Sequence, residues 1–188
     1  KIAVELNKYC KENKNVSFMD APVSGGQAGA ENGQLTIMIG GDNTTYNTIQ
    51  PLLNSYAKNS TLIGNSGSGQ LAKMMNQICI AGLLQGLAEA INFGQKANLD
   101  IEKVIGVIKD GAASSWQMEN RYKTMVKNEF DFGFAVEWMR KDLKICLDQA
   151  DEVGARLPVT ALIDQFYSNV LEIGGKRWDT SSLIKLLR

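Results

Sequence analysis

Apolar and polar positions follow two different repeats over the first 65 residues. Apolar side chains recur every three or four positions over residues 2–12 and 42–56, which predicts helices, whereas short apolar runs over 16–21, 35–39 and 60–63 predict strands. Strands that alternate with helices of this length indicate an α/β sheet. Because a complete doubly wound domain needs more strands, we interpret residues 1–65 as the C-terminal portion of a Rossmann-type domain.

From residue 66 to the end the strand pattern disappears and the repeat becomes helical, which predicts an all-α domain over 66–188. Its first helix, over 68–97, is apolar on nearly every side between Ile78 and Ile91, so we expect it to lie inside the protein or against a second subunit. The other expected helices are 101–109 after Asp100, a helix to 127 from a capping box at Ser114 and Gln117, 135–153 before Gly154, 159–173, and a short one from Asp179 or Thr180.

Composition narrows the choice of partners. Lysine plus arginine balances aspartate plus glutamate at 20 each, without a basic stripe, so nucleic acid is not an expected partner. The uninterrupted apolar runs are far shorter than the roughly 18 residues of a membrane span, so we expect a cytoplasmic protein with no membrane partner. Three widely spaced cysteines, Cys10, Cys79 and Cys146, are typical of reduced thiols, and without histidine no metal site is expected.

The absence of histidine also limits the chemistry. A general acid/base near neutral pH must then be a lysine, carboxylate, tyrosine or thiol. Lys73 and Asn76 share one face of the predicted helix in Gly67-Ser-Gly-Gln-Leu-Ala-Lys-Met-Met-Asn76, among apolar residues that would favour a neutral amine, and Gly69 is expected to leave open space for a ligand beside it. The alternatives are an ordinary solvated lysine and an anion-binding helix start at Gly67-x-Gly69.

Two other segments carry candidate binding residues. In Asp20-Ala-Pro-Val-Ser-Gly-Gly26, Ser24, Gly25 and Gly26 follow a predicted strand, where their amides and hydroxyl could bind a carboxylate, although a plain turn has the same sequence pattern. Phe134, Lys141 and Asp142 lie on a later helix, where a packed aromatic and a solvated charged face are the ordinary interpretation.

Together these three motifs resemble, in order and spacing, the β-hydroxyacid dehydrogenases, the family of 3-hydroxyisobutyrate dehydrogenase and glyoxylate/succinic semialdehyde reductase. The resemblance covers essentially the whole chain and implies a helical domain like the C-terminal domain of 6-phosphogluconate dehydrogenase. It implies that Lys73 is the catalytic lysine, that Asn76 orients the substrate, and that Ser24, Gly25 and Gly26 bind the carboxylate of a small β-hydroxy acid or semialdehyde. It further implies NAD or NADP as cofactor, with Phe134, Lys141 and Asp142 on the cofactor side, and a homodimer or homotetramer.

The chain departs from the family in one respect. The strand, G-x-G-x-x-G turn and helix that hold the dinucleotide pyrophosphate are absent from the sequence, so we expect a fragment with little cofactor affinity of its own. 6-Phosphogluconate dehydrogenase itself is disfavoured, because its relatives place a histidine near the lysine. A non-catalytic helical dimerisation module and a small-carboxylate-binding protein without redox chemistry remain the alternatives.

Overall fold

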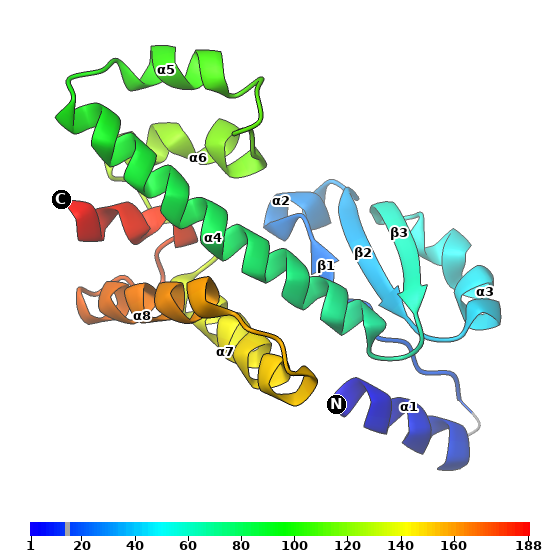
Figure 1. Ribbon diagram of the computed structural model, residues 1–188. Helices are drawn as coiled ribbons and strands as arrows, with labels where there is room; N and C mark the ends of the chain where they lie inside the picture. The colour runs from blue at the N-terminus through cyan, green and yellow to red at the C-terminus, as the bar shows by residue number, and fades with distance from the viewer. Residues whose placement is uncertain (14–15) are drawn as a thin grey trace. The chain divides into compact units, whose positions relative to one another are not determined.

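The computed structural model describes residues 1–13 and 16–188, which divide by their internal contacts into two compact units, Lys1–Asn76 and Gln77–Arg188 (Figure 1). The division falls inside the longest helix, α4, Ser68–Lys96. It lies eleven residues beyond the boundary expected from the sequence, which placed residues 1–65 and 66–188 in separate domains. Each unit is described by itself.

The first unit is built on a three-stranded sheet in the order β1-β2-β3. The central strand β2 pairs antiparallel with β1, with Val23 opposite Ile37, and parallel with β3, with Ile37 opposite Ser60. The small core of the first unit consists of the buried residues Leu35, Ile37, Ile39 and Leu53. The elements in chain order are α1 Ile2–Asn13, β1 Val23–Ser24, α2 Gly26–Glu31, β2 Leu35–Gly40, α3 Asn43–Leu53 and β3 Ala57–Gly64.

The predicted strand over 16–21 is wrong, apart from one bridge. Within that segment only Asp20 pairs with the sheet, through its amide to the Gly40 carbonyl at 3.0 Å and the return bond from the Gly40 amide at 2.8 Å. Pro22 has no amide hydrogen to continue the ladder, and regular pairing begins again only at Val23. The glycine-rich stretch after it forms the short helix α2 in place of a simple turn.

The carboxylate of Asp20 caps the start of α4. It accepts hydrogen bonds from the amides of Gly67 at 2.6 Å and Gln70 at 2.9 Å, and the residue is only 4% exposed. These bonds satisfy helix-terminal amides that have no intrahelical partner. Asp20 therefore links the end of β2 to the helix that carries Lys73.

Gly69 does not leave the open space that the sequence indicated. A Cβ on Gly69 would collide with the Met38 carbonyl oxygen, and it would lie 2.9 Å from both an Asp20 carboxylate oxygen and the Gly40 amide nitrogen. The glycine is needed because the helix lies directly against the backbone of β2. Any open volume beside Lys73 must therefore lie elsewhere on the helix.

The second unit is helical, as predicted. Its core takes Leu84 and Ile91 from α4, Met139 and Leu143 from α7, and Tyr167 from α8, together with other buried residues. The elements that follow α4 are α5 Ile101–Ile108, α6 Trp116–Lys127, α7 Val136–Val153, α8 Pro158–Glu172 and the 3₁₀ helix η1 Thr180–Leu187.

The helix ends in this unit agree with the sequence prediction, with one exception. Asp100 caps α5 by accepting from the Lys103 amide, and Gly154 ends α7 in the left-handed conformation. The cap of α6 is Ser115, which accepts from the Met118 amide, so the predicted capping box at Ser114 is wrong by one residue. Serine occupies both positions, and the sequence alone does not distinguish them.

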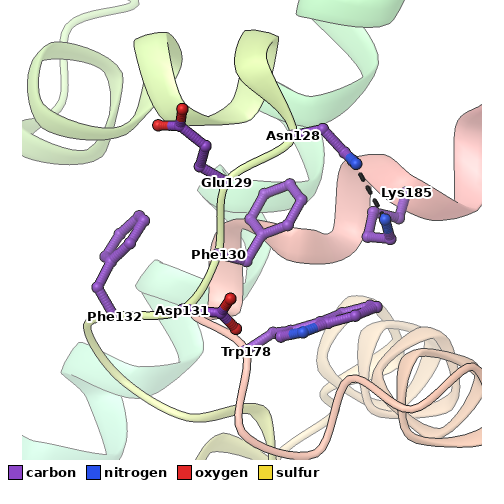
Figure 2. A pocket seen from close by; sticks show the side chains of 7 residues that line it. All are labelled: Asn128, Glu129, Phe130, Asp131, Phe132, Trp178 and Lys185. Atoms are coloured by element: carbon purple, nitrogen blue, oxygen red, sulfur yellow. Dashed lines mark hydrogen bonds between the residues drawn. The ribbon is translucent and has the colours of Figure 1, made fainter.

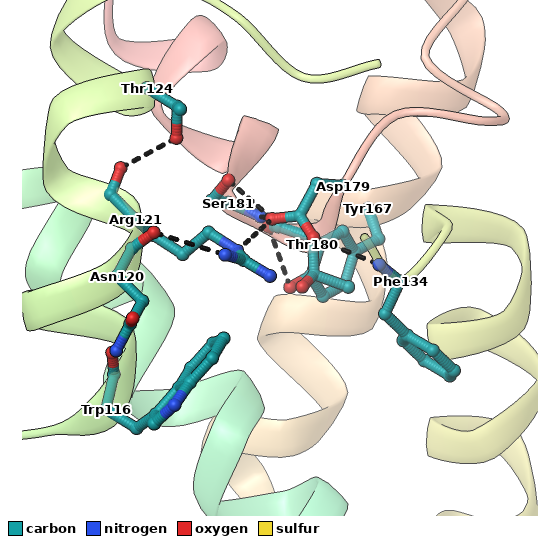
Figure 3. A network of polar contacts seen from close by, with 9 residues as sticks. All are labelled: Trp116, Asn120, Arg121, Thr124, Phe134, Tyr167, Asp179, Thr180 and Ser181. Atoms are coloured by element: carbon teal, nitrogen blue, oxygen red, sulfur yellow. Dashed lines mark hydrogen bonds and ion pairs between the residues drawn. The ribbon is translucent and has the colours of Figure 1, made fainter. Parts of the chain in front are cut away.

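Asp179 organises the C-terminal part of the second unit. Its carboxylate accepts hydrogen bonds from the amides of Phe134 and Ser181 and from the Ser181 hydroxyl, and it pairs with Arg121 at 3.4 Å (Figure 3). Gly133 lies so close that a Cβ there would overlap this carboxylate. The buried charge is thus paired and hydrogen-bonded, and it fixes the backbone just before α7.

Helix α4 is long and apolar enough, by length and composition alone, to cross a bilayer, a test that the core helix of a globular protein also passes. Its burial is partial, since Leu71, Met75 and Phe93 are exposed while Leu84 and Ile91 belong to the core. Within Ile78–Ile91, the stretch expected to lie inside the protein or against a second subunit, Leu84 and Ile91 are buried while Cys79 and Glu89 are exposed, so one copy of the chain covers this stretch only in part.

The contact at Gly69 generates a prediction about stability. Gly69→Ala should lower the free energy of unfolding by about 2–3 kcal/mol, because the added methyl meets backbone atoms that cannot move aside cheaply. The matched control is Gly106→Ala within α5, where no atom lies within 4 Å of the added Cβ. There alanine should stabilise the helix by about 0.5–1 kcal/mol.

Urea unfolding followed by circular dichroism measures both changes. Equal effects of the two substitutions would contradict the close packing of α4 on β2.

Candidate active site

Lys73 and Asn76 lie about one turn apart, in the second and third turns of α4. Both side chains are half-buried, whereas Leu71 and Met75 on other faces of the same turns are exposed. Positions three residues apart on a helix project from the same side. The amine and the amide can therefore act on the same small molecule, which is the arrangement that an acid/base lysine and an orienting amide need.

The carboxylate-binding candidates lie in the same unit. Ser24 ends β1, where it pairs with Thr36, and Gly25 and Gly26 follow with φ angles of 124° and 60°, which favour glycine. A Cβ on Gly25 would press against Leu35 at 3.3 Å, whereas no atom lies within 4 Å of a Cβ on Gly26. The turn therefore packs against Leu35 at Gly25, whereas the space beside Gly26 is open, so that a ligand could approach the backbone there.

Asp20 connects these two groups of residues. It lies four residues before Ser24, and it binds the amide of Gln70, which lies three residues before Lys73. The anion-binding alternative for Gly67-x-Gly69 is resolved by the same contact, because the anion at this helix start is the carboxylate of Asp20 itself.

Lys141 and Asp142 lie within α7 in the second unit, whereas Phe134, which was expected on the same helix, lies two residues before its start. The Phe134 ring packs on Trp138, with centroids 5.8 Å apart and planes at 59°, and the Phe134 amide is held by Asp179. The Lys141 ammonium lies 2.8 Å from one oxygen of Asp142. The segment thus carries an aromatic pair and an ion pair.

Sequence reasoning missed two residues that support these groups. One is Asp20, whose signal was an acidic residue in an otherwise apolar run. The other is Gln77, which is 3% exposed and donates to the second oxygen of Asp142 at 2.7 Å and to the Met139 sulfur at 3.9 Å. Its signal was a lone amide on the apolar helix α4, one turn after Lys73.

The buried thiol of Cys146 is unsuited to acid/base work. Burial raises the pKa of this thiol to about 11, and the negative charge of Asp142 contributes to the rise. Burial likewise raises the pKa of Tyr167, with a further contribution from Asp179. Both groups therefore stay neutral near pH 7 and belong to the core.

Two surface cavities are lined by other residues of the second unit. One, of about 410 Å³, is lined in part by Lys185 (Figure 2). The Lys185 ammonium lies 4.8 Å from the Trp178 ring centre and 5.8 Å from the Phe130 ring centre, and it donates a hydrogen bond to the Asn128 side chain. The other, of about 550 Å³, lies among α4, α5 and α6. Neither contains a predicted site residue, and within residues 1–13 and 16–188 no three potential metal ligands gather.

Sequence comparison places the two parts of the chain in known families. Residues 67–187 match the family described as NAD-binding of NADP-dependent 3-hydroxyisobutyrate dehydrogenase, and residues 1–64 match the NAD binding domain of 6-phosphogluconate dehydrogenase. An uncharacterized oxidoreductase of Shewanella frigidimarina is 58% identical over 186 residues, which are 99% of this chain and 64% of that protein. The 2-hydroxy-3-oxopropionate reductase of Escherichia coli is 34% identical over 186 residues, 98% of this chain and 64% of that protein.

A solved structure agrees with this placement. The 3-hydroxyisobutyrate dehydrogenase of Mycobacterium tuberculosis, determined with L-serine, superimposes with a TM-score of 0.88 at 28% identity, covering 99% of this chain and 66% of that one. The chain thus spans about two thirds of the length of the relatives it matches. The fold is that of a Rossmann-type portion followed by a helical domain, and the chain belongs to the NAD(P)-dependent β-hydroxyacid dehydrogenases, the 3-hydroxyisobutyrate dehydrogenase family.

Proposed function

We propose that the protein containing this chain transfers a hydride between NAD or NADP and a small β-hydroxy acid or semialdehyde, with Lys73 as general acid/base. The observation that carries the proposal is that Lys73 and Asn76 lie one turn apart on α4, whose first turn is capped by Asp20, in a chain that belongs to this family. Relatives named 2-hydroxy-3-oxopropionate reductase and 2-(hydroxymethyl)glutarate dehydrogenase support an acid substrate bearing a hydroxyl or oxo group.

The roles of the residues follow from their chemistry. In the oxidation direction the neutral Lys73 amine accepts the proton of the substrate hydroxyl, and in reduction the Lys73 ammonium returns a proton to the carbonyl oxygen. The nicotinamide, when bound, supplies the acceptor or donor of the hydride. Asn76 orients the substrate oxygen, while the amides of Gly25 and Gly26 and the Ser24 hydroxyl bind its carboxylate, which holds the reacting carbon in position.

The second unit contributes to cofactor binding in this proposal. The residues of this segment fit a dinucleotide in part, since Lys141 carries an ammonium on a side chain that is 65% exposed, and Phe134 and Trp138 of the same segment form an aromatic pair. Asp142 forms an ion pair with Lys141. The discrimination between NAD and NADP is not assigned to any of these residues.

Self-association and a cytoplasmic location belong to the same proposal. Phe93 on α4 and Val107 on α5 are 71% and 78% exposed, and apolar surface of this kind favours a homodimer or homotetramer. Small carboxylates are the proposed substrates, and neither nucleic acid nor a membrane is a proposed partner. A purely structural dimerisation module is the alternative, and it requires no chemistry at Lys73.

Replacement of the lysine tests the catalytic assignment. In the full-length enzyme Lys73→Ala should lower kcat by about 10²–10⁴-fold, the usual contribution of general acid/base catalysis, while leaving cofactor affinity nearly unchanged. The control is Lys96→Ala at the exposed far end of the same helix. Steady-state turnover with a β-hydroxy acid, and cofactor titration, give both values. Wild-type turnover in Lys73→Ala would exclude the proposed role.

The expectation that this chain alone has little affinity for the cofactor has its own test. Titration of the 188-residue chain with NADH and NADPH, followed by nucleotide fluorescence, should show weak or undetectable binding, because the sequence contains no G-x-G-x-x-G segment to hold the pyrophosphate. Tight binding by this chain alone would show that the missing motif is not required.

Sedimentation velocity tests self-association. The chain should sediment as a dimer or larger species, and Phe93→Ser should shift it toward the monomer by removing apolar surface, with Lys96→Ser as the exposed polar control. A wild-type chain that remains monomeric at every concentration would contradict the proposed assembly.

A further inference from the structure

Gln77 occupies an unusual position on α4. It is an amide that is 3% exposed on an apolar helix, one turn after Lys73, and its Nε2 donates 2.7 Å to Asp142 Oδ2. A buried amide is retained at low cost only where it is hydrogen-bonded. Its bond to a carboxylate on α7 is charge-assisted and therefore among the stronger kinds of hydrogen bond.

Asp142 divides its two oxygens between two partners. Oδ2 accepts from Gln77 and Oδ1 pairs with the Lys141 ammonium at 2.8 Å. The aspartate side chain is 15% exposed, whereas that of the lysine is 65% exposed. The carboxylate thus accepts a hydrogen bond from a buried amide through one oxygen and pairs with an exposed ammonium through the other.

The ion pair joins two adjacent residues of α7, Lys141 and Asp142, and helix geometry does not by itself bring adjacent side chains together. Side chains at i and i+1 normally project in different directions. The Lys141 side chain must therefore bend toward Asp142, and an exposed pair of this kind is weak unless one partner is fixed. Gln77 supplies that fixation, because it restricts the carboxylate to one orientation.

We infer that Gln77 is a positioning residue: through Asp142 it places the Lys141 ammonium for binding the anionic cofactor. This inference rests on the proposed function, in which Lys141 lies on the cofactor side. Gln77 touches neither substrate nor cofactor in this arrangement. It makes the helix that carries the catalytic lysine also responsible for the position of the cofactor-binding lysine.

The variant Gln77→Met tests the inference, since methionine keeps the length and the apolar packing of the side chain but removes the donor. In the full-length enzyme the Kd for NADPH or NADH, measured by nucleotide fluorescence without turnover, should rise about tenfold, the usual effect of losing a hydrogen bond to a charged group. The rate kcat at saturating cofactor should stay within about twofold, because only binding is affected.

The matched control is Gln85→Met. Gln85 lies on the same helix and bonds to Glu89 on α4 itself, so its replacement should leave the Kd unchanged. Asp142→Asn keeps the shape of the side chain but weakens its interactions with both Gln77 and Lys141, so it should raise the Kd as Gln77→Met does. It replaces Gln77→Met in the test if Gln77→Met folds poorly.

A double-mutant cycle separates positioning from general destabilisation. In a Lys141→Met background, itself about tenfold weaker in cofactor binding, Gln77→Met should have little further effect. Additive losses, or a fall in kcat that accompanies the loss of thermal stability, would mean that Gln77 is merely structural and would overturn the inference.

The two levels of the proposal fail in different ways. If Lys141→Met binds cofactor as tightly as wild type, the assignment of Lys141 to the cofactor fails and the inference fails with it. If Lys141→Met weakens binding and Gln77→Met does not, the cofactor assignment stands and only the role of Gln77 is lost.

Discussion

The contact between Asp20 and the start of α4 is the constraint on which the first unit depends. One buried carboxylate accepts from two helix amides while its own backbone pairs with Gly40 at the end of β2. Because the helix start meets the strand backbone at Gly69, the separation between the sheet and α4 is fixed by atoms that cannot adjust. The face that carries Lys73 and Asn76 therefore has a set position relative to the Ser24 turn in the same unit.

A buried carboxylate also fixes the backbone in the second unit. Asp179 binds the Phe134 amide and pairs with Arg121, whose guanidinium in turn lies 4.7 Å from the Trp116 ring centre and 5.0 Å from that of Phe132. Asp142 links α7 to Gln77. In both units a paired carboxylate, more than apolar packing alone, sets the backbone or side chain on which the proposed chemistry depends.

Local sequence patterns predicted most of the elements but not these contacts. The helices α4, α5, α7 and α8 and the strand β2 follow from apolar repeats and from terminal signals such as Asp100 before α5 and Gly154 after α7. The strand predicted over 16–21 failed because this segment is a connection, exposed or half-buried outside Asp20, that meets the sheet only at Asp20, whose carboxylate binds the amide of Gly67, 47 positions along the chain. The roles of Asp20 and Gln77 are long-range contacts, which spacing along one chain does not encode. The grouping of Lys73, Asn76 and the Ser24 turn came from a resemblance, and their roles remain proposals.

The close approach of Gly40, Gly69 and Asp20 also limits how this protein can diverge. A side chain at either glycine would occupy the space of the carboxylate, and a larger acid at position 20 would displace the helix. The three positions are therefore sterically coupled, and a substitution at one of them should be tolerated only with compensating changes at the others. Descendants of this fold should be free to vary the exposed flank of the long helix while its first turn stays nearly invariant.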